Sequence, residues 1–173
     1  MDEGYKFKRI SVNFSASSFR YKKFMEGVLG IVDSNLVPHE KLAMELTESV
    51  TDTDDEIMIS TIENMKKAGV RVYLDDFGTG YSNFDRILSL GLDVIKFDRS
   101  LLVMACKDDK AKFTLNHFSK AFSEIGFKVL FEGVETDEQQ ALCEAAGADY
   151  LQGYKFSKPI PIDELRRFFE KES

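Results

Sequence analysis

Residues 72–82 of the chain read Val-Tyr-Leu-Asp-Asp-Phe-Gly-Thr-Gly-Tyr-Ser. An apolar, β-prone run ends there at two adjacent carboxylates, Asp75 and Asp76. The glycines that follow, Gly78 and Gly80, permit tight turns of the backbone. Two neighbouring like charges repel each other, and a divalent cation at the end of a strand is the simplest partner that makes the pair favourable. A solvated Asp-Asp turn is the alternative interpretation.

The composition is that of one globular domain. The chain has 173 residues, 43% of them hydrophobic, which is enough for a single core. Its net charge of -7 argues against non-specific binding to DNA or to an anionic membrane surface, because such partners require a basic surface. A phosphate ligand would therefore need metal ions or a local lysine.

Cysteine usage and hydropathy indicate the compartment. Cys106 and Cys143 lie far apart without a metal-binding spacing, so we interpret them as free thiols in a reducing environment. No apolar run approaches the roughly 18 residues that a membrane-spanning helix needs, and the N-terminus does not have the pattern of a signal peptide. We therefore expect a cytoplasmic protein, with no membrane contact by this segment.

Strand and helix patterns alternate six times along the chain. The period-two pattern predicts strands at residues 10–15, 42–47, 70–75, 93–98, 128–132 and 150–154. Helical spacing and capping signals predict helices at residues 20–35, 57–65, 82–90, 110–125, 136–147 and 163–171. The acidic residues 51–55 are interpreted as the cap of the second helix rather than as part of a site. Because no linker or repeat interrupts the alternation, we predict one α/β domain with a parallel sheet.

Helical spacing also groups side chains on the helices. Phe24, Val28, Ile31 and Val32 share one face of the first helix, and Phe113, His117, Ala121 and Ile125 lie near one another on the fourth. In the last helix we predict that Leu165, Phe168 and Phe169 face inward.

Each predicted strand has one apolar face and a polar residue near its C-terminal end. The apolar faces carry Val12 and Phe14, Met44 and Leu46, Val72 and Leu74, Ile95 and Phe97, and Val129 and Phe131. The polar positions on the second face are Asn13, Glu45, Asp75, Lys96, Glu132 and Gln152. In an open doubly wound sheet helices would bury this second face, at a cost of about 1 to 3 kcal/mol for each unpaired polar group. A (β/α) barrel avoids this cost, because its C-terminal mouth gathers such side chains around a ligand.

Carboxylates, an amide and a lysine that converge at one mouth are typical of a divalent metal site. Oxygen ligands favour Mg²⁺ or Mn²⁺ over zinc. The two histidines, His39 in a loop and His117 on a helix, are predicted to lie outside the site. The alternative is a purely structural set of ion pairs, for instance between Lys96 and Glu132 or Asp75.

Six motifs, in this order and spacing, resemble the EAL domain family of cyclic-di-GMP phosphodiesterases. They are Ser-Val-Asn-Phe-Ser around Asn13, Glu-Leu-Thr-Glu from Glu45, Asp-Asp-Phe-Gly-Thr-Gly-Tyr-Ser from Asp75, Lys-Phe-Asp-Arg-Ser from Lys96, Glu-Gly-Val-Glu-Thr from Glu132 and Gln-Gly-Tyr-Lys-Phe-Ser-Lys-Pro from Gln152. The resemblance covers residues 10–161 and implies a modified TIM barrel that hydrolyses cyclic-di-GMP to linear pGpG.

The resemblance also implies roles for individual residues. Two Mg²⁺ or Mn²⁺ ions would be held by Asn13, Glu45, Asp75, Asp76 and Glu132. Lys96 would hold the attacking water or stabilise charge at phosphorus, and Gln152 would lie beside substrate and water, so that the implied catalytic residues are Lys96, Glu132 and Gln152. Glu48 would brace the loop at residues 77–82, which in the family couples metal binding to dimer contacts. Asp98 and Glu135 are further candidates at the substrate site.

The chain departs from the family pattern at one place. The Glu-Ala-Leu motif, whose glutamate is a metal ligand, does not occur, and the chain begins where the third strand of the family would lie. About two strands, on the order of 80 residues of a barrel of about 250, are therefore expected to be missing. We predict the C-terminal three quarters of one EAL-type domain over residues 1–173, a partial TIM-type barrel with about six of eight strands, in which hydrolysis is impaired or absent.

Six strands cannot close an eight-stranded cylinder, so this barrel would leave two uncovered edges. We expect another copy of the chain, distortion of the sheet or the N-terminal segment to cover them. The expected partners are therefore cyclic-di-GMP and either a homo-oligomer or the missing N-terminal part of the same protein.

Two other functions fit parts of the pattern. A non-catalytic receptor or regulatory module for cyclic-di-GMP would explain the missing glutamate, although a receptor has little use for so many metal ligands. An enolase-like site, with Mg²⁺ on strand-end carboxylates and a lysine as base, would use the same barrel mouth. The glycine loop after Asp76 and the single interior lysine argue against the enolase-like site.

Overall fold

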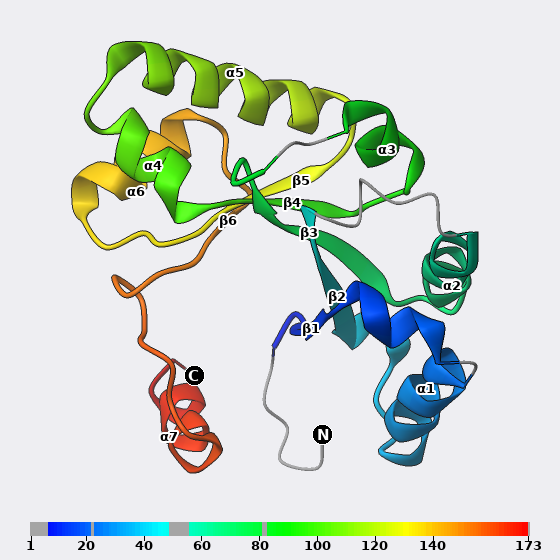
Figure 1. The fold of residues 1–173 in the computed structure, drawn as a ribbon. Helices are drawn as coiled ribbons and strands as arrows, with labels where there is room; N and C mark the ends of the chain where they lie inside the picture. The colour runs from blue at the N-terminus through cyan, green and yellow to red at the C-terminus, as the bar shows by residue number, and fades with distance from the viewer. Residues whose placement is uncertain (1–6, 22, 49–55, 81–82, 173) are drawn as a thin grey trace.

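The computed structural model describes residues 7–21, 23–48, 56–80 and 83–172. Strands and helices alternate along the chain as the sequence predicted (Figure 1). The strands are β1 (Ile10–Phe14), β2 (Leu42–Thr47), β3 (Arg71–Phe77), β4 (Val94–Phe97), β5 (Lys128–Phe131) and β6 (Tyr150–Leu151). The helices are η1 (Ala16–Arg20), α1 (Phe24–Ser34), η2 (His39–Lys41), α2 (Glu56–Lys67), α3 (Phe84–Ser89), α4 (Arg99–Ala105), α5 (Asp109–Glu124), α6 (Asp137–Ala145) and α7 (Ile162–Glu172).

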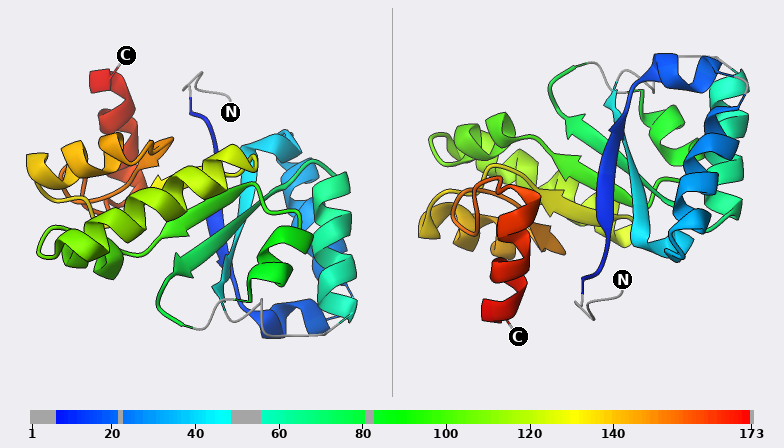
Figure 2. Two further views of the ribbon diagram at one scale, coloured as in Figure 1. Left: turned by 90° about the horizontal axis from the view of Figure 1, so that it is seen from above. Right: turned by 90° about the horizontal axis from the view of Figure 1, so that it is seen from below.

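The six strands form one parallel sheet in the order β1-β2-β3-β4-β5-β6. Each strand pairs with its neighbour in sequence, without the reversal of strand order that defines a doubly wound sheet. The sheet is strongly twisted and curls into part of a barrel (Figures 1 and 2). The predicted fold class, an α/β partial TIM-type barrel with six strands, is therefore confirmed.

Most predicted elements are confirmed, with differences at the last strand and at α4. The last strand is shorter than predicted, since only Tyr150–Leu151 pairs with β5. Helix α4 was not predicted, although Asp98 caps it by accepting a hydrogen bond from the backbone N–H of Ser100 at 2.8 Å. The predicted capping residues 51–55 and the end of the loop at residues 81–82 lie outside the described residues.

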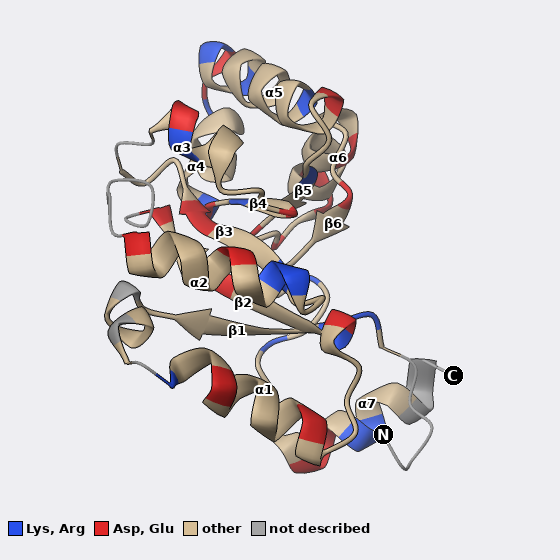
Figure 3. Ribbon diagram, turned by 90° about the vertical axis from the view of Figure 1, so that its right-hand side faces the viewer, with Lys and Arg blue, Asp and Glu red and all other residues tan. Residues whose placement is uncertain are grey.

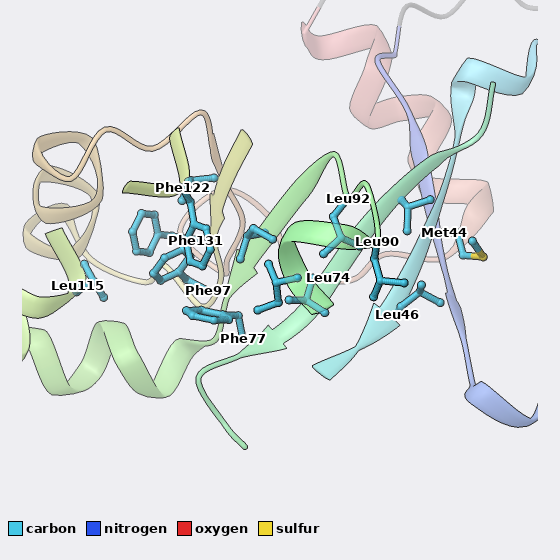
Figure 4. Packing of buried hydrophobic residues seen from close by; sticks show 14 of the residues in the cluster. Met44, Leu46, Leu74, Phe77, Leu90, Leu92, Phe97, Leu115, Phe122 and Phe131 are labelled. Carbon is cyan, nitrogen blue, oxygen red and sulfur yellow. The ribbon is translucent and has the colours of Figure 1, made fainter. Parts of the chain in front are cut away.

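The main core lies between the outer face of the sheet and the helices. The apolar strand positions predicted from the sequence are buried there, apart from those of β1: Met44, Leu46, Val72, Leu74, Ile95, Phe97, Val129 and Phe131. Figure 4 shows the aromatic side chains Phe77, Phe97, Phe122 and Phe131 gathered at one end of this core and Met44 at the other. The opposite face of the strands is therefore the inner face of the barrel, as predicted.

Several side chains that helical spacing groups on one face are exposed, among them Phe168, whose predicted inward position was wrong. Ile31 of α1 is 68% exposed, and Phe113 and Ile125 of α5 are 64% and 57% exposed. Helix α5 instead buries Leu115 and Phe122, and Phe122 packs edge-on against Phe77 at 5.1 Å between ring centroids. The same holds at α7, where Phe168 is 37% exposed and the helix projects away from the sheet (Figure 1). The spacing of apolar residues shows that a helix has an apolar stripe, but packing against the aromatic core determines which stripe is buried.

The inner face carries a smaller apolar layer towards the amino ends of the strands. Ala43, Tyr73 and Val94 form it, with Leu130 and Tyr150 packed against them. Residues 7–9 reach across this layer, since Arg9 donates to the Tyr73 hydroxyl at 3.4 Å and Lys8 donates to the Tyr150 hydroxyl at 2.6 Å. The N-terminal segment thus covers part of the open barrel, which is one of the three predicted arrangements.

The two edges of the sheet are β1 and β6, and no ladder joins them in the described part of the chain. On β1 the side chains of Ile10 and Val12 are 57% and 41% exposed. Val12, predicted to lie on a buried face, is exposed because an edge strand has a neighbour on one side only. In the view of Figure 3, acidic and basic segments are scattered among one another over the helices.

Gly153, just after β6, lies so close to the β5–α6 turn that a Cβ would overlap the backbone N and O of Val134. We predict that Gly153→Ala lowers the free energy of unfolding by roughly 1 to 3 kcal/mol, because backbone atoms cannot move aside as a flexible side chain can. Gly30→Ala is the matched control: no atom lies within 4 Å of its Cβ position in α1, and alanine favours a helix by up to about 1 kcal/mol. Chemical denaturation of both variants measures the difference, and equal effects would contradict the close approach.

Candidate metal centre

The inner face of the barrel gathers charged side chains at the carboxyl ends of its strands. Lys96 of β4 lies at their centre, with its Nζ 2.7 Å from Asp75, 2.9 Å from Glu132 and 3.0 Å from Glu45. These residues come from β2, β3, β4 and the position directly after β5. Lys96 is 2% exposed, so the ammonium group is shielded from water by the carboxylates that it binds. The convergence of these four residues, predicted from strand alternation, is confirmed.

The carboxylates around Lys96 stabilise its positive charge. Burial alone would lower the pKa of Lys96, but hydrogen bonds from the ammonium to Asp75, Glu132 and Glu45 outweigh burial and raise the pKa. The ion pairs proposed as the structural alternative therefore exist. These ion pairs do not neutralise all the negative charge at the mouth, because one ammonium group cannot balance three carboxylates in contact with it and the neighbouring Asp76.

A β-bulge brings Asp76 to the same place as Asp75. Leu74 pairs with Ile95 and Phe77 pairs with Phe97, so β3 has one residue more than β4 between these pairs. Asp76 adopts a left-handed backbone with φ of 58°, which aspartate tolerates better than most residues. Leu74 and Phe77 both stay in the outer core. In a regular strand Asp76 would share the side of Leu74, whereas the bulge frees it for the mouth.

Asp75, Asp76 and Glu132 together can hold a metal ion. Each offers a carboxylate oxygen, and these oxygens lie within 4.8 Å of one another. Burial raises the pKa of Asp76, and the nearby charges of Asp75 and Asp98 raise it further. Burial also raises the pKa of Glu132, against the opposing effect of Lys96. A cation at this cluster would relieve the repulsion that these shifts express, and oxygen ligands suit hard divalent ions.

The two amide candidates lie beside the cluster. Asn13 is opposite Glu45 in the register of β1 and β2, and paired residues of parallel strands share a face. The backbone N–H of Gln152 donates to the carbonyl of Phe131 at 2.9 Å, which places Gln152 next to Glu132. Both side chains are exposed. Their proposed contacts with metal and substrate stay predictions.

The remaining candidates make contacts around the mouth. Glu48 is 5% exposed and accepts a hydrogen bond from the backbone N–H of Gly80 at 2.9 Å, which is the contact that a brace of the glycine loop needs. Asp98 caps α4 and lies near enough to Asp76 to affect its pKa. Glu135 forms an ion pair with Arg99 at 2.9 Å. Sequence reasoning did not single out Arg99, although the glycine after Glu132 was a signal for a close contact there.

Neither histidine takes part in this cluster. His39 binds the carbonyl oxygen of Ala68 at 2.8 Å and the carboxylate of Asp33 at 2.7 Å, between α1 and α2. His117 lies on α5 and stacks on Phe113 at 3.9 Å between ring centroids. The prediction that both lie outside the site agrees with these contacts. Cys106 and Cys143 are free thiols, and burial raises the pKa of Cys143 to about 12.

A comparison with protein families shows the family of the chain. The sequence profile of the EAL domain matches residues 2–159. The chain belongs to the EAL domain family. The family resemblance read from the six motifs is thus confirmed, whereas the missing Glu-Ala-Leu segment stays a prediction.

Three similar proteins place this EAL domain among known ones. The chain is 31% identical over 156 residues to the oxygen sensor protein DosP of Escherichia coli K12, covering 90% of this chain and 20% of DosP. It is 27% identical over 163 residues to the cyclic di-GMP phosphodiesterase PdeR of the same organism, covering 94% of this chain and 25% of PdeR. The structure of the PaMucR phosphodiesterase in complex with c-di-GMP has a TM-score of 0.87 at 28% identity, covering 95% of this chain and 66% of that one. The chain therefore spans a quarter or less of the length of the two curated relatives.

Within the described ranges, no helix of this EAL domain is both long enough and apolar enough to cross a bilayer.

We predict that Lys96→Met destabilises the protein by about 3 to 5 kcal/mol at neutral pH, because it leaves buried carboxylates without their counter-charge. Burial raises the pKa of Glu132 and Lys96 opposes that shift, so without Lys96 this pKa should rise further, and the loss should shrink as the pH falls from about 7 to about 5 and Glu132 gains a proton. Lys128→Met is the control. It removes the more exposed ion pair with Asp149 and should have a much smaller effect, because water screens an exposed ion pair. Denaturation at both pH values measures the effects, and a loss that does not depend on pH would contradict the explanation.

Proposed function

We propose that the chain is a metal-dependent cyclic-di-GMP phosphodiesterase domain that opens the cyclic dinucleotide to linear pGpG. The observation that carries the proposal is the cluster of Asp75, Asp76 and Glu132 oxygens, all within 4.8 Å, beside the buried Lys96 ammonium. PdeR and PaMucR, which are similar to this chain, are named as phosphodiesterases, and PaMucR is described in complex with c-di-GMP. We further propose that residues 1–173 form one EAL-type domain, the C-terminal three quarters of a barrel. Its hydrolytic activity is impaired in the isolated chain.

Two Mg²⁺ or Mn²⁺ ions are proposed as cofactors. In the order of the strands, Asp75 and Asp76 on β3 lie between Asn13 and Glu45, on β1 and β2, and Glu132, directly after β5. This arrangement supports Asp75 as a ligand shared by both ions. Such cations, when bound, polarise a phosphodiester and lower the pKa of a water molecule.

The protein groups have separate tasks in this proposal. Lys96 is proposed as a fixed hydrogen-bond donor, because its ammonium group is held by Asp75, Glu132 and Glu45. It can hold the attacking water or stabilise negative charge that develops at phosphorus. Glu132 binds Lys96 together with Asp75 and Glu45, and the exposed Gln152, directly after β6, is proposed to contact substrate and water.

The proposal is tested by Glu132→Gln. Removing one carboxylate ligand should lower Mn²⁺ affinity and Mn²⁺-dependent hydrolysis of cyclic-di-GMP by at least about 100-fold, because the amide leaves the cluster without one of its anionic donors. Glu63→Gln is the matched control, since Glu63 is exposed on α2 and pairs only weakly with Lys67 at 4.0 Å. Calorimetry measures metal and dinucleotide binding, and chromatography measures pGpG.

One set of results would contradict the phosphodiesterase proposal. If the chain binds cyclic-di-GMP equally well in EDTA, takes up no Mn²⁺ and forms no pGpG, the phosphodiesterase proposal fails. A non-catalytic receptor for cyclic-di-GMP would then be the better assignment.

We also propose that the chain self-associates, or associates with a preceding part of the same protein, in the cytoplasm. The support is the exposed apolar edge of β1, with Ile10 57% and Val12 41% exposed. Val12→Lys should shift sedimentation towards the monomer, because a charged side chain opposes pairing at a strand edge. Ile57→Lys, at a 63% exposed position on α2, should leave sedimentation unchanged. A wild-type chain that is monomeric at every concentration would contradict self-association.

A further inference from the structure

Arg99, the first residue of α4, reaches across the mouth of the barrel from β4 towards β5. Its Nη2 lies 2.9 Å from the carboxylate of Glu135. The two side chains are 55% and 37% exposed, so this ion pair by itself contributes little to the stability of the fold. The path that the side chain of Arg99 takes to reach Glu135 is more informative.

The aliphatic part of Arg99 lies directly on the backbone of Gly133. A Cβ at Gly133 would overlap Cβ, Cγ and Cδ of Arg99, so only glycine leaves room for the arginine. Gly133 has a φ of 67°, a left-handed conformation in which the chain turns sharply directly after Glu132. Arg99 thus packs on the turn through its stem and binds the far end of the turn through its guanidinium group.

The other side of the same turn is held by the end of β6. The backbone N–H of Val134 donates to the carbonyl of Gln152 at 3.0 Å, and the backbone N–H of Lys155 donates to the carbonyl of Val134 at 3.0 Å. Gly153 packs against Val134 so closely that it has no room for a side chain. The backbone N–H of Glu135 also donates to the side chain of Gln139 at 2.7 Å, so Arg99 adds a contact at Gly133 that these hydrogen bonds do not make.

Glu132 depends on this turn because it follows the last residue of β5. Its backbone N–H donates to the carbonyl of Phe97 at 3.1 Å, but its direction beyond that bond is set by the chain at Gly133. Its carboxylate is 2.9 Å from Lys96 and within the cluster of Asp75 and Asp76. A shift of the turn would move this carboxylate out of the cluster.

We infer that Arg99 is a positioning residue for Glu132: with its stem on Gly133 and its guanidinium on Glu135, it holds the turn that directs the Glu132 carboxylate into the metal centre. The inference rests on the proposed function for its consequence in catalysis, whereas the positioning itself is a property of the folded chain. Arg99 touches neither substrate nor metal in this scheme and acts only through the turn.

The test compares three changes at Arg99 with a matched control. Arg99→Met keeps most of the stem and removes the charge, Arg99→Ala removes both, and Arg99→Lys keeps a charge without the planar fork. The control is Arg71→Met, because Arg71 is 45% exposed and pairs with Asp93 at the same 2.9 Å, but at the amino end of the sheet. Mn²⁺ affinity, measured by calorimetry, is the first readout.

Arg99→Ala should weaken Mn²⁺ binding by about 10- to 100-fold, the range for groups that orient metal ligands. Arg99→Met should lose less, because the stem still covers Gly133, and Arg99→Lys should recover part of the loss. The turnover number for cyclic-di-GMP should fall more than KM rises, since a misplaced Glu132 affects the reaction more than substrate capture. If Arg99→Ala bound Mn²⁺ as tightly as Arg71→Met and the wild type do, the inference would be overturned.

A second measurement separates this inference from the proposed function. In metal-free buffer, chemical denaturation of Arg99→Met, Glu132→Gln and the double variant forms a mutant cycle. Positioning predicts that the midpoint shift of the double variant differs from the sum of the single shifts, because the two residues act through one turn. Additive shifts would overturn the role of Arg99. If the wild-type chain took up no Mn²⁺, the proposed function would fail, while this cycle would still decide the inference.

Discussion

The buried ammonium group of Lys96 is the interaction on which the mouth of the barrel depends. It binds carboxylates from β2, from β3 and from the residue after β5, so one cation links the ends of four consecutive parallel strands. Without Lys96 the carboxylates would repel one another, and without the carboxylates the buried ammonium would be strongly unfavourable. Because a single positive charge neutralises only part of this cluster, the group that stabilises the fold also leaves a site that attracts further cations.

Around this cluster the backbone departs from regular geometry at the places where charged groups are needed. The bulge in β3 lets two consecutive carboxylates reach the mouth while Leu74 and Phe77 both remain in the core. Past β5, the left-handed Gly133 turns the chain directly after Glu132. Such conformations persist only where surrounding contacts hold them, and the contacts at the mouth come from neighbouring strands and loops. The regular parts of the strands supply the rigid core, and the irregular ends supply the chemistry.

Much of the candidate site was predictable because the relevant signals are local. Alternation with a period of two assigns Glu45, Lys96 and Glu132 to one face, and their position near strand ends assigns them to the mouth. Asp76 was a candidate because it adjoins Asp75, whereas regular alternation places it on the other side of the strand, and only the bulge in β3 explains how it reaches the mouth. The contact of Arg99 with Gly133 and Glu135 had no comparable signal, since it joins loops that are more than thirty residues apart.

The alternation of apolar and polar residues, read along the chain alone, was enough to specify six parallel strands, their inner and outer faces and a carboxylate-rich mouth. These properties follow from the geometry of a strand and from the order of the elements. Which stripe of a helix is buried required the folded structure: α5 turns Leu115 and Phe122 inward and leaves Phe113 and Ile125 in solvent. The reason is that an amphipathic pattern is a property of one helix. Which face is buried depends on the other elements that pack against the helix, and these come together only when the chain folds.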